Sequence, residues 1–206
     1  MEYDTIQDPK LKKLFHHADM LLFDVYGMFR SLPPAGGDGG GGNFSIVLVL
    51  LCIVDGLATE AWPGRSLATE QGRRFKRLIR AKLPWGPEGK GKWVQKGIAA
   101  DQLYNEFRNP LVHELGADKV AKSRPRAYVE PIIGKWGSVP DDMKDISLID
   151  ALPKWKDGWP LFSEITDKHG ERRFKLSAAG LYWAVKRLAI EMAADASRSQ
   201  GKKRSP

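Results

Sequence analysis

The sequence predicts a mainly α protein: an antiparallel helical bundle with a small C-terminal β-hairpin and a final helix. Several segments place apolar residues at helical spacing, and loops rich in glycine and proline separate them. Near the C-terminus, a pair of short segments flanks a glycine-containing turn, which is typical of a hairpin. We expect residues 1–120 to form the bundle core, residues 121–197 a C-terminal extension packed on it, and residues 198–206 a basic, disordered tail.

The first helix is expected to begin at Asp8-Pro9, because aspartate is a good N-cap and proline fits the first helical position. Residues at helical spacing then form an apolar face before Pro33-Pro34: Leu11, Leu14, Phe15, Ala18, Leu21, Leu22, Val25, Met28, Phe29 and Leu32. His16 and His17 are adjacent, so their side chains point about 100° apart and form a poor chelate. We therefore expect no metal site here.

A glycine-rich stretch, residues 36–42, predicts a mobile connector. It lacks the Gly-Lys-Ser/Thr ending of a phosphate-binding P-loop. The apolar run at residues 44–54 predicts a buried central helix capped by Asn43, with a core strand as the alternative. Because the run is shorter than the ~20 residues of a membrane span, we expect no membrane association.

The third helix is expected at residues 70–83, with Phe75, Leu78, Ile79 and Leu83 inward. It is the most basic segment of the chain, and the following loop places Trp85 and Trp93 among further lysines. Cations and aromatic rings suit a nucleic acid, whereas a solvated face and a loop anchored to the core are the structural alternatives. The candidate nucleic-acid-binding residues are Arg73, Arg74, Arg77, Arg80, Lys90 and Lys92.

Composition narrows the function classes. The chain has 206 residues and a net charge of +8, which favours polyanionic partners, although a merely soluble basic protein has the same balance. Cys52 is the only cysteine, which excludes an internal disulfide and a multi-cysteine zinc site. The N-terminus lacks the basic and apolar regions of a secretory signal, so we expect a cytoplasmic protein.

The C-terminal part is expected to be irregular around residues 123–126 and 131–140, with a short helix at residues 141–152. Residues 161–165 and 171–176 predict the hairpin, with His169 as an ordinary turn residue. Ser177 is expected to cap the last helix, residues 178–196. Its predicted inward face is Leu181, Val185, Leu188 and Met192.

A fourth helix, starting near Ile98, leads into the most informative stretch, residues 103–116. Pro110 is expected to push Asn109 out of the αR region, so that Asn109 caps a restarted helix and Arg108 and His113 converge on one cleft. Arginine suits phosphate oxygens, and histidine exchanges protons near neutral pH. The structural alternative is a surface ion pair of Arg108 with Glu106 or Glu114, beside a half-buried His113.

Arg108-Asn109, three further residues and then His113 resemble the signature of the HEPN family: arginine, a polar residue and histidine, with four to six residues between the outer two. The resemblance implies a helical bundle and a symmetric dimer in which paired motifs meet in a cleft. Many family members are metal-independent endoribonucleases, and others have lost catalysis and serve as binding modules.

The resemblance implies RNA cleavage by the neighbouring 2′-OH, giving a 2′,3′-cyclic phosphate without metal or cofactor. His113 would be the acid or base, Arg108 would stabilise the transition state, and Asn109 would cap the helix or bind phosphate or His113. The expected partners are RNA and a second chain, with a regulatory protein as a further candidate. The alternatives are a non-catalytic HEPN-like module that binds RNA or a protein, and an interaction protein with an accidental match.

Overall fold

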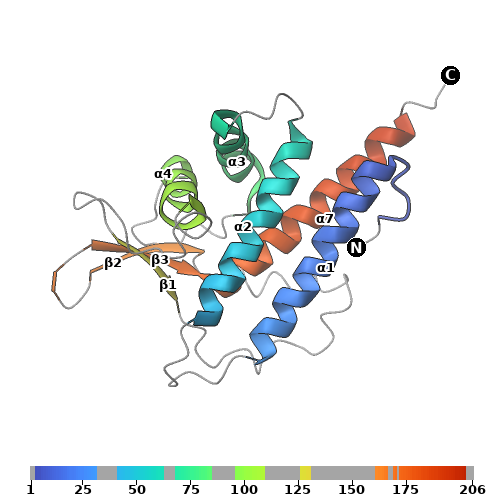
Figure 1. The fold of residues 1–206 in the computed structure, drawn as a ribbon. Helices are drawn as coiled ribbons and strands as arrows, with labels where there is room; N and C mark the ends of the chain where they lie inside the picture. The colour runs from blue at the N-terminus through green and yellow to red at the C-terminus, as the bar shows by residue number, and fades with distance from the viewer. Residues whose placement is uncertain are drawn as a thin grey trace.

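The computed structural model describes residues 3–31, 41–62, 68–84, 96–109, 126–130, 161–166, 169–170 and 172–202. The helices are α1 (Pro9–Ser31), α2 (Gly41–Ala61), α3 (Ala68–Lys82), α4 (Lys96–Gln102), a π-helical segment η1 (Leu103–Arg108) and α7 (Ala178–Lys202). The strands are β1 (Arg126–Glu130), β2 (Phe162–Thr166) and β3 (Arg172–Ser177). Figure 1 shows α1 and α3 on opposite sides of α2, with the sheet beside one end of the helices. The predicted mainly α class with a hairpin and a final helix is confirmed.

Local capping sets the start of α1 as predicted. The Asp8 Oδ1 accepts the backbone N–H of Lys10 at 2.8 Å and of Leu11 at 3.3 Å, which satisfies donors that a helix start leaves open. The predicted inward face is buried or partly buried where the structure describes it, except for Leu21, which is 38% exposed. Leu22 occupies the centre of the buried face, so its neighbour Leu21 points about 100° away.

α2 is the central helix of the bundle, as predicted. It contacts α1, α3 and α7, and its buried side chains share one broad face: Ile46, Val47, Leu50, Leu51, Ile53, Val54, Leu57 and Ala58. On the opposite side, Ser45, Cys52 and Thr59 are exposed. The helix begins at Gly41, so the expectation that Asn43 caps it is wrong, and the last glycines of the predicted connector are helical.

The length of α2 also corrects an expectation. By length and composition alone, Phe44–Ala61 is long and apolar enough to cross a membrane, with a mean hydropathy of 2.0. The expectation that this segment is too short for a span is therefore wrong. The core helix of a soluble protein meets the same criterion, and 44% of this window is buried inside the structure.

α7 belongs to the bundle core. The Ser177 Oγ accepts the Gly180 N–H at 3.0 Å, which confirms the predicted cap. The predicted inward face of α7 is buried in the same cluster as α1, α2 and α3. The last helix is thus part of the core and not only of an extension packed on it. α7 continues to Lys202, so the expectation of a disordered tail is wrong for residues 198–202.

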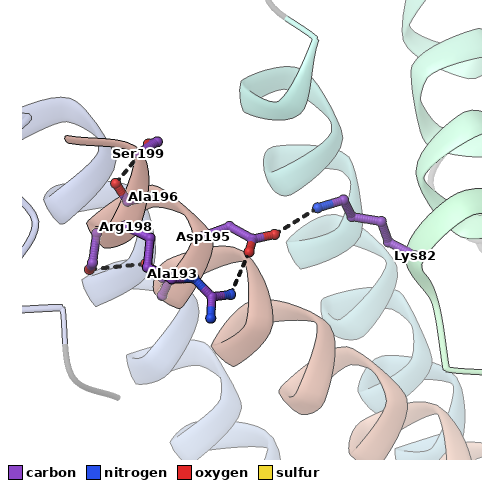
Figure 2. Close-up of polar contacts among 7 residues, drawn as sticks. Lys82, Ala193, Asp195, Ala196, Arg198 and Ser199 are labelled. Atoms are coloured by element: carbon purple, nitrogen blue, oxygen red, sulfur yellow. Dashed lines mark hydrogen bonds and ion pairs between the residues drawn. The ribbon is translucent and has the colours of Figure 1, made fainter. Parts of the chain in front are cut away.

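Polar contacts hold the end of α7 and join it to α3. Arg198 donates to the Asp195 Oδ1 at 2.7 Å, and the Asp195 Oδ2 binds Lys82 Nζ of α3 at 3.0 Å (Figure 2). These bonds from Arg198 and Lys82 lower the pKa of Asp195 below its ordinary value. A carboxylate with a lowered pKa stabilises the fold at pH values above its unfolded-state pKa. This stabilisation is lost as the pH falls through the folded-state pKa. The contribution is small because the pairs are exposed.

The sheet is larger than predicted. β2 and β3 pair antiparallel, with Phe162 opposite Leu176, which confirms the hairpin. β1 pairs parallel with β3, giving the order β1-β3-β2. β1 was not predicted because it lies between Pro125 and Pro131, in a stretch that reads as irregular. The helix expected at residues 141–152 lies outside the described residues.

Candidate functional site

The irregular turn at Arg108 begins before the proline. Leu103–Arg108 is π-helical, and the Asn109 N–H donates to the carbonyl oxygen of Tyr104, five residues earlier. Asn109 has φ −65° and ψ −50°, which is αR, so the expectation that it leaves this region and caps a restarted helix is wrong. The irregularity is instead a widened turn within the helix before Pro110, which the sequence did not predict, and such turns are frequent at functional sites.

The Arg108 guanidinium binds Asp55, a residue that sequence reasoning did not assign to the site. Arg108 Nε donates to the Asp55 Oδ2 at 2.8 Å, and Arg108 Nη2 lies 2.7 Å from the same oxygen. Arg108 is only 9% exposed, and both side chains are largely withdrawn from water. The ion pair joins the end of η1 to α2.

Burial raises the pKa of Asp55 above its ordinary value, and the hydrogen bonds and positive charge of Arg108 oppose this rise. Both Arg108 donors use the Oδ2 atom. The Asp55 Oδ1 is buried and has no hydrogen-bond partner within the described ranges. The pair therefore compensates only part of the cost of removing the carboxylate from water.

Two neighbours orient the guanidinium further. Arg108 Nη1 donates to the Asn109 Oδ1 at 3.2 Å, so Asn109 fixes the arginine instead of capping a helix. The Arg108 Cζ lies 5.5 Å from the centre of the Tyr104 ring, within the range of a cation–π contact. The Tyr104 ring also lies 5.4 Å from that of Phe75 and 5.1 Å from the Lys76 Nζ, both of α3. The guanidinium is therefore linked to α2 and α3.

Gly72 of α3 makes room for this ring. A Cβ at position 72 would lie 2.7 Å from the Tyr104 Cζ and 2.8 Å from its Oη, which is closer than atoms pack. Glycine otherwise costs a helix about 1 kcal/mol relative to alanine. The space required by Tyr104 explains a glycine in the middle of this helix.

We expect Gly72→Ala to destabilise the protein by about 1 kcal/mol. Overpacking against Tyr104 costs about 1–3 kcal/mol, and the higher helix propensity of alanine offsets about 1 kcal/mol of this. Urea unfolding measures this change. Gly56→Ala is the matched control: among the described residues its Cβ meets only the Leu14 Cδ1, at an ordinary 3.5 Å, so it should be neutral or stabilising. If both variants gained stability equally, Tyr104 would not require the glycine.

The predicted basic residues of α3 are partly exposed but already have partners. Arg73 pairs with Glu70 at 2.8 Å, Arg80 with Asp101 at 3.0 Å, and Arg77 lies 4.6 Å above the Trp62 ring. Arg74 also has a polar or electrostatic contact. Exposed ion pairs contribute at most about 1 kcal/mol, so a polyanion can displace the carboxylates. These four arginines stay candidate phosphate contacts.

The remaining predicted residues cannot be placed. His113, Lys90 and Lys92 lie outside the described residues, so the convergence of Arg108 and His113 stays a prediction. Within the ranges that are described, no three histidine, cysteine or acidic side chains group as metal ligands.

The fold and site define a class: a mainly helical bundle with a buried arginine–aspartate pair at a π-helical turn. Models of known protein families, curated proteins and solved structures show no match to this chain. The HEPN resemblance therefore rests on the arginine–asparagine–histidine motif alone.

Proposed function

We propose that the chain is a HEPN-like, metal-independent endoribonuclease in which His113 is the acid or base and Arg108 stabilises the scissile phosphate. One observation supports this best: the motif arginine is held in one orientation by Asp55, Asn109 and Tyr104. A charge that is already oriented need not reorganise when negative charge develops on phosphate, which is the main source of electrostatic catalysis.

The donor count of Arg108 is compatible with this role. A guanidinium has five N–H groups. Its described contacts use three of them, two on Asp55 and one on Asn109. The other two suit the oxygens of a phosphodiester, and Asp55 and Tyr104 act as positioning residues.

In the proposed reaction, neutral His113 removes the proton of the 2′-OH, and the 2′ oxygen attacks the adjacent phosphorus. The bond to the 5′ oxygen then breaks, and that oxygen takes a proton from water, to which the protonated His113 returns one, which leaves a 2′,3′-cyclic phosphate and a 5′-OH. Proton transfer by a positioned side chain contributes about 10²–10⁴-fold. The basic face of α3 would hold the RNA backbone. A homodimer, a cytoplasmic location and a regulatory protein partner remain parts of this proposal.

The second candidate function is a non-catalytic HEPN-like module that binds RNA or a protein. The observation that favours it is the burial of Arg108 against a carboxylate, because the pair is neutral as a unit and only 9% of the arginine is exposed. In this case the pair has a structural role, and the basic face of α3 provides salt-dependent binding without turnover.

RNA cleavage in excess EDTA separates these candidates. We expect the wild type to cut RNA but not DNA of the same sequence, with a 2′,3′-cyclic phosphate end. His113→Ala should reduce the rate by at least about 10²-fold. His169→Ala, at an exposed turn position, is the matched histidine control and should retain full activity.

Each other result has a defined meaning. Salt-dependent RNA binding without cleavage would replace the proposal with the binding module. Metal-dependent cleavage of both RNA and DNA, or full activity of His113→Ala, would show that the motif is not the catalyst.

A further inference from the structure

Arg77 of α3 differs from its neighbours Arg73 and Arg80 in what it contacts. Its Cζ lies 4.6 Å from the centre of the Trp62 ring, the shortest cation–ring distance in the described part of the chain. Arg73 and Arg80 pair with carboxylates, whereas Arg77 has no carboxylate partner among the described residues. Arg77 is exposed, so one face of its guanidinium lies over the ring and the opposite face is accessible.

The Trp62 side chain is a fixed support for this guanidinium. Trp62 directly follows α2, and its backbone N–H donates to the Ala58 carbonyl oxygen at 3.3 Å. Its side chain is partly buried and packs against the hydrophobic core. A ring that is already held in place does not lose freedom when a ligand binds, which lowers the cost of binding. Trp62 and Arg77 therefore form a preorganised platform.

Two further cations flank this platform. Arg73 lies four residues before Arg77 and Arg80 three residues after it, so all three share one face of α3, about one turn apart. The Arg73 side chain is 75% exposed and the Arg80 side chain is 46% exposed. Ion pairs this exposed are weak, so phosphates can replace the carboxylates. The face thus places a stacking surface between two cations that suit phosphate.

We propose that the platform of Trp62 and Arg77 binds one unpaired base of an RNA strand. The base stacks on the accessible face of the Arg77 guanidinium, and Arg73 and Arg80 contact the phosphates on either side of it. Unpaired bases stack on guanidinium planes, whereas the bases of a duplex are covered by their neighbours. The flanking cations favour a base within a strand over a free nucleotide. This inference rests on the proposed function in requiring RNA as the ligand, and it adds a site that selects single strands.

Binding to strands that cannot be cleaved tests the platform. A single-stranded 2′-O-methyl RNA lacks the free 2′-OH that the proposed reaction needs, and an abasic strand of the same length has the same charge without bases. Fluorescence anisotropy measures the dissociation constant of each. We expect the wild type to bind the base-bearing strand about fivefold or more tightly than the abasic strand.

The variant Arg77→Lys keeps the positive charge and removes the flat surface. It should weaken binding of the base-bearing strand by about fivefold or more, and leave binding of the abasic strand and of a 2′-O-methyl duplex unchanged. Trp62→Leu, which removes the ring and keeps an apolar side chain, should have the same effect. Arg198→Lys is the matched control: Arg198 is 73% exposed and pairs with Asp195, so the variant should bind all three ligands as the wild type does.

Because Arg77 is exposed, Arg77→Lys should show wild-type helical circular dichroism. Equal wild-type affinity for the base-bearing and abasic strands, or an Arg77→Lys variant that binds both as the wild type does, would overturn the inference. Displacement of the strand by an equimolar mononucleotide would do the same, because the site would then take a free nucleotide. Base-dependent binding without RNA cleavage would uphold the platform and reject the ribonuclease, and cleavage without base-dependent binding would do the reverse.

Discussion

Asp55→Ala should destabilise the folded protein by about 3–5 kcal/mol, because it leaves the buried Arg108 cation without its carboxylate. Arg108 is 9% exposed, so water can replace little of the lost interaction. The free energy of unfolding in urea measures the effect. If Arg108 also binds phosphate, the variant should lose RNA cleavage even where it remains folded, since the guanidinium is no longer oriented.

A double-mutant cycle separates the energetic contribution of the Asp55–Arg108 ion pair from the cost of burying its two charges. Replacing both charges, as in Asp55→Leu/Arg108→Met, should be less destabilising than Asp55→Ala alone, because burial already raises the pKa of Asp55 despite the ion pair. Asp195→Ala, which removes an exposed carboxylate, should cost no more than about 1 kcal/mol. An Asp55→Ala variant as stable as Asp195→Ala would show that the pair is not buried in solution.

Phe75→Ala should cost about 3–5 kcal/mol, the usual range for a fully buried aromatic residue. The Phe75 ring is fully buried between α3 and the core and lies against Tyr104. Its removal leaves a cavity and also withdraws support from the ring next to Arg108. Thermal and urea unfolding measure the loss of stability.

The matched control is Phe44→Ala. Phe44 is 38% exposed, and we expect its truncation to cost less than about 1.5 kcal/mol because less apolar surface returns to water. Equal losses for the two variants would contradict the packing of α3 against η1.

The sequence was most informative where the determining interactions are local. Asp8 and Ser177 cap helices through bonds two or three residues away, and the buried positions of α3 and α7 follow from helical spacing. The partner of Arg108 could not be predicted, because Asp55 lies 53 residues away. The one signal was an acidic residue directly after the apolar run of α2. The π-helical turn and β1 likewise depend on tertiary contacts that no short pattern encodes.

Tyr104 touches both the basic helix α3, through Gly72, Phe75 and Lys76, and the arginine of the motif. One rigid ring is thus shared by two groups that are more than twenty residues apart in the chain. A polyanion that shifts α3 must also rotate or release the guanidinium. If the chain cleaves RNA as proposed, its affinity for RNA and its turnover should accordingly change together whenever α3 is altered.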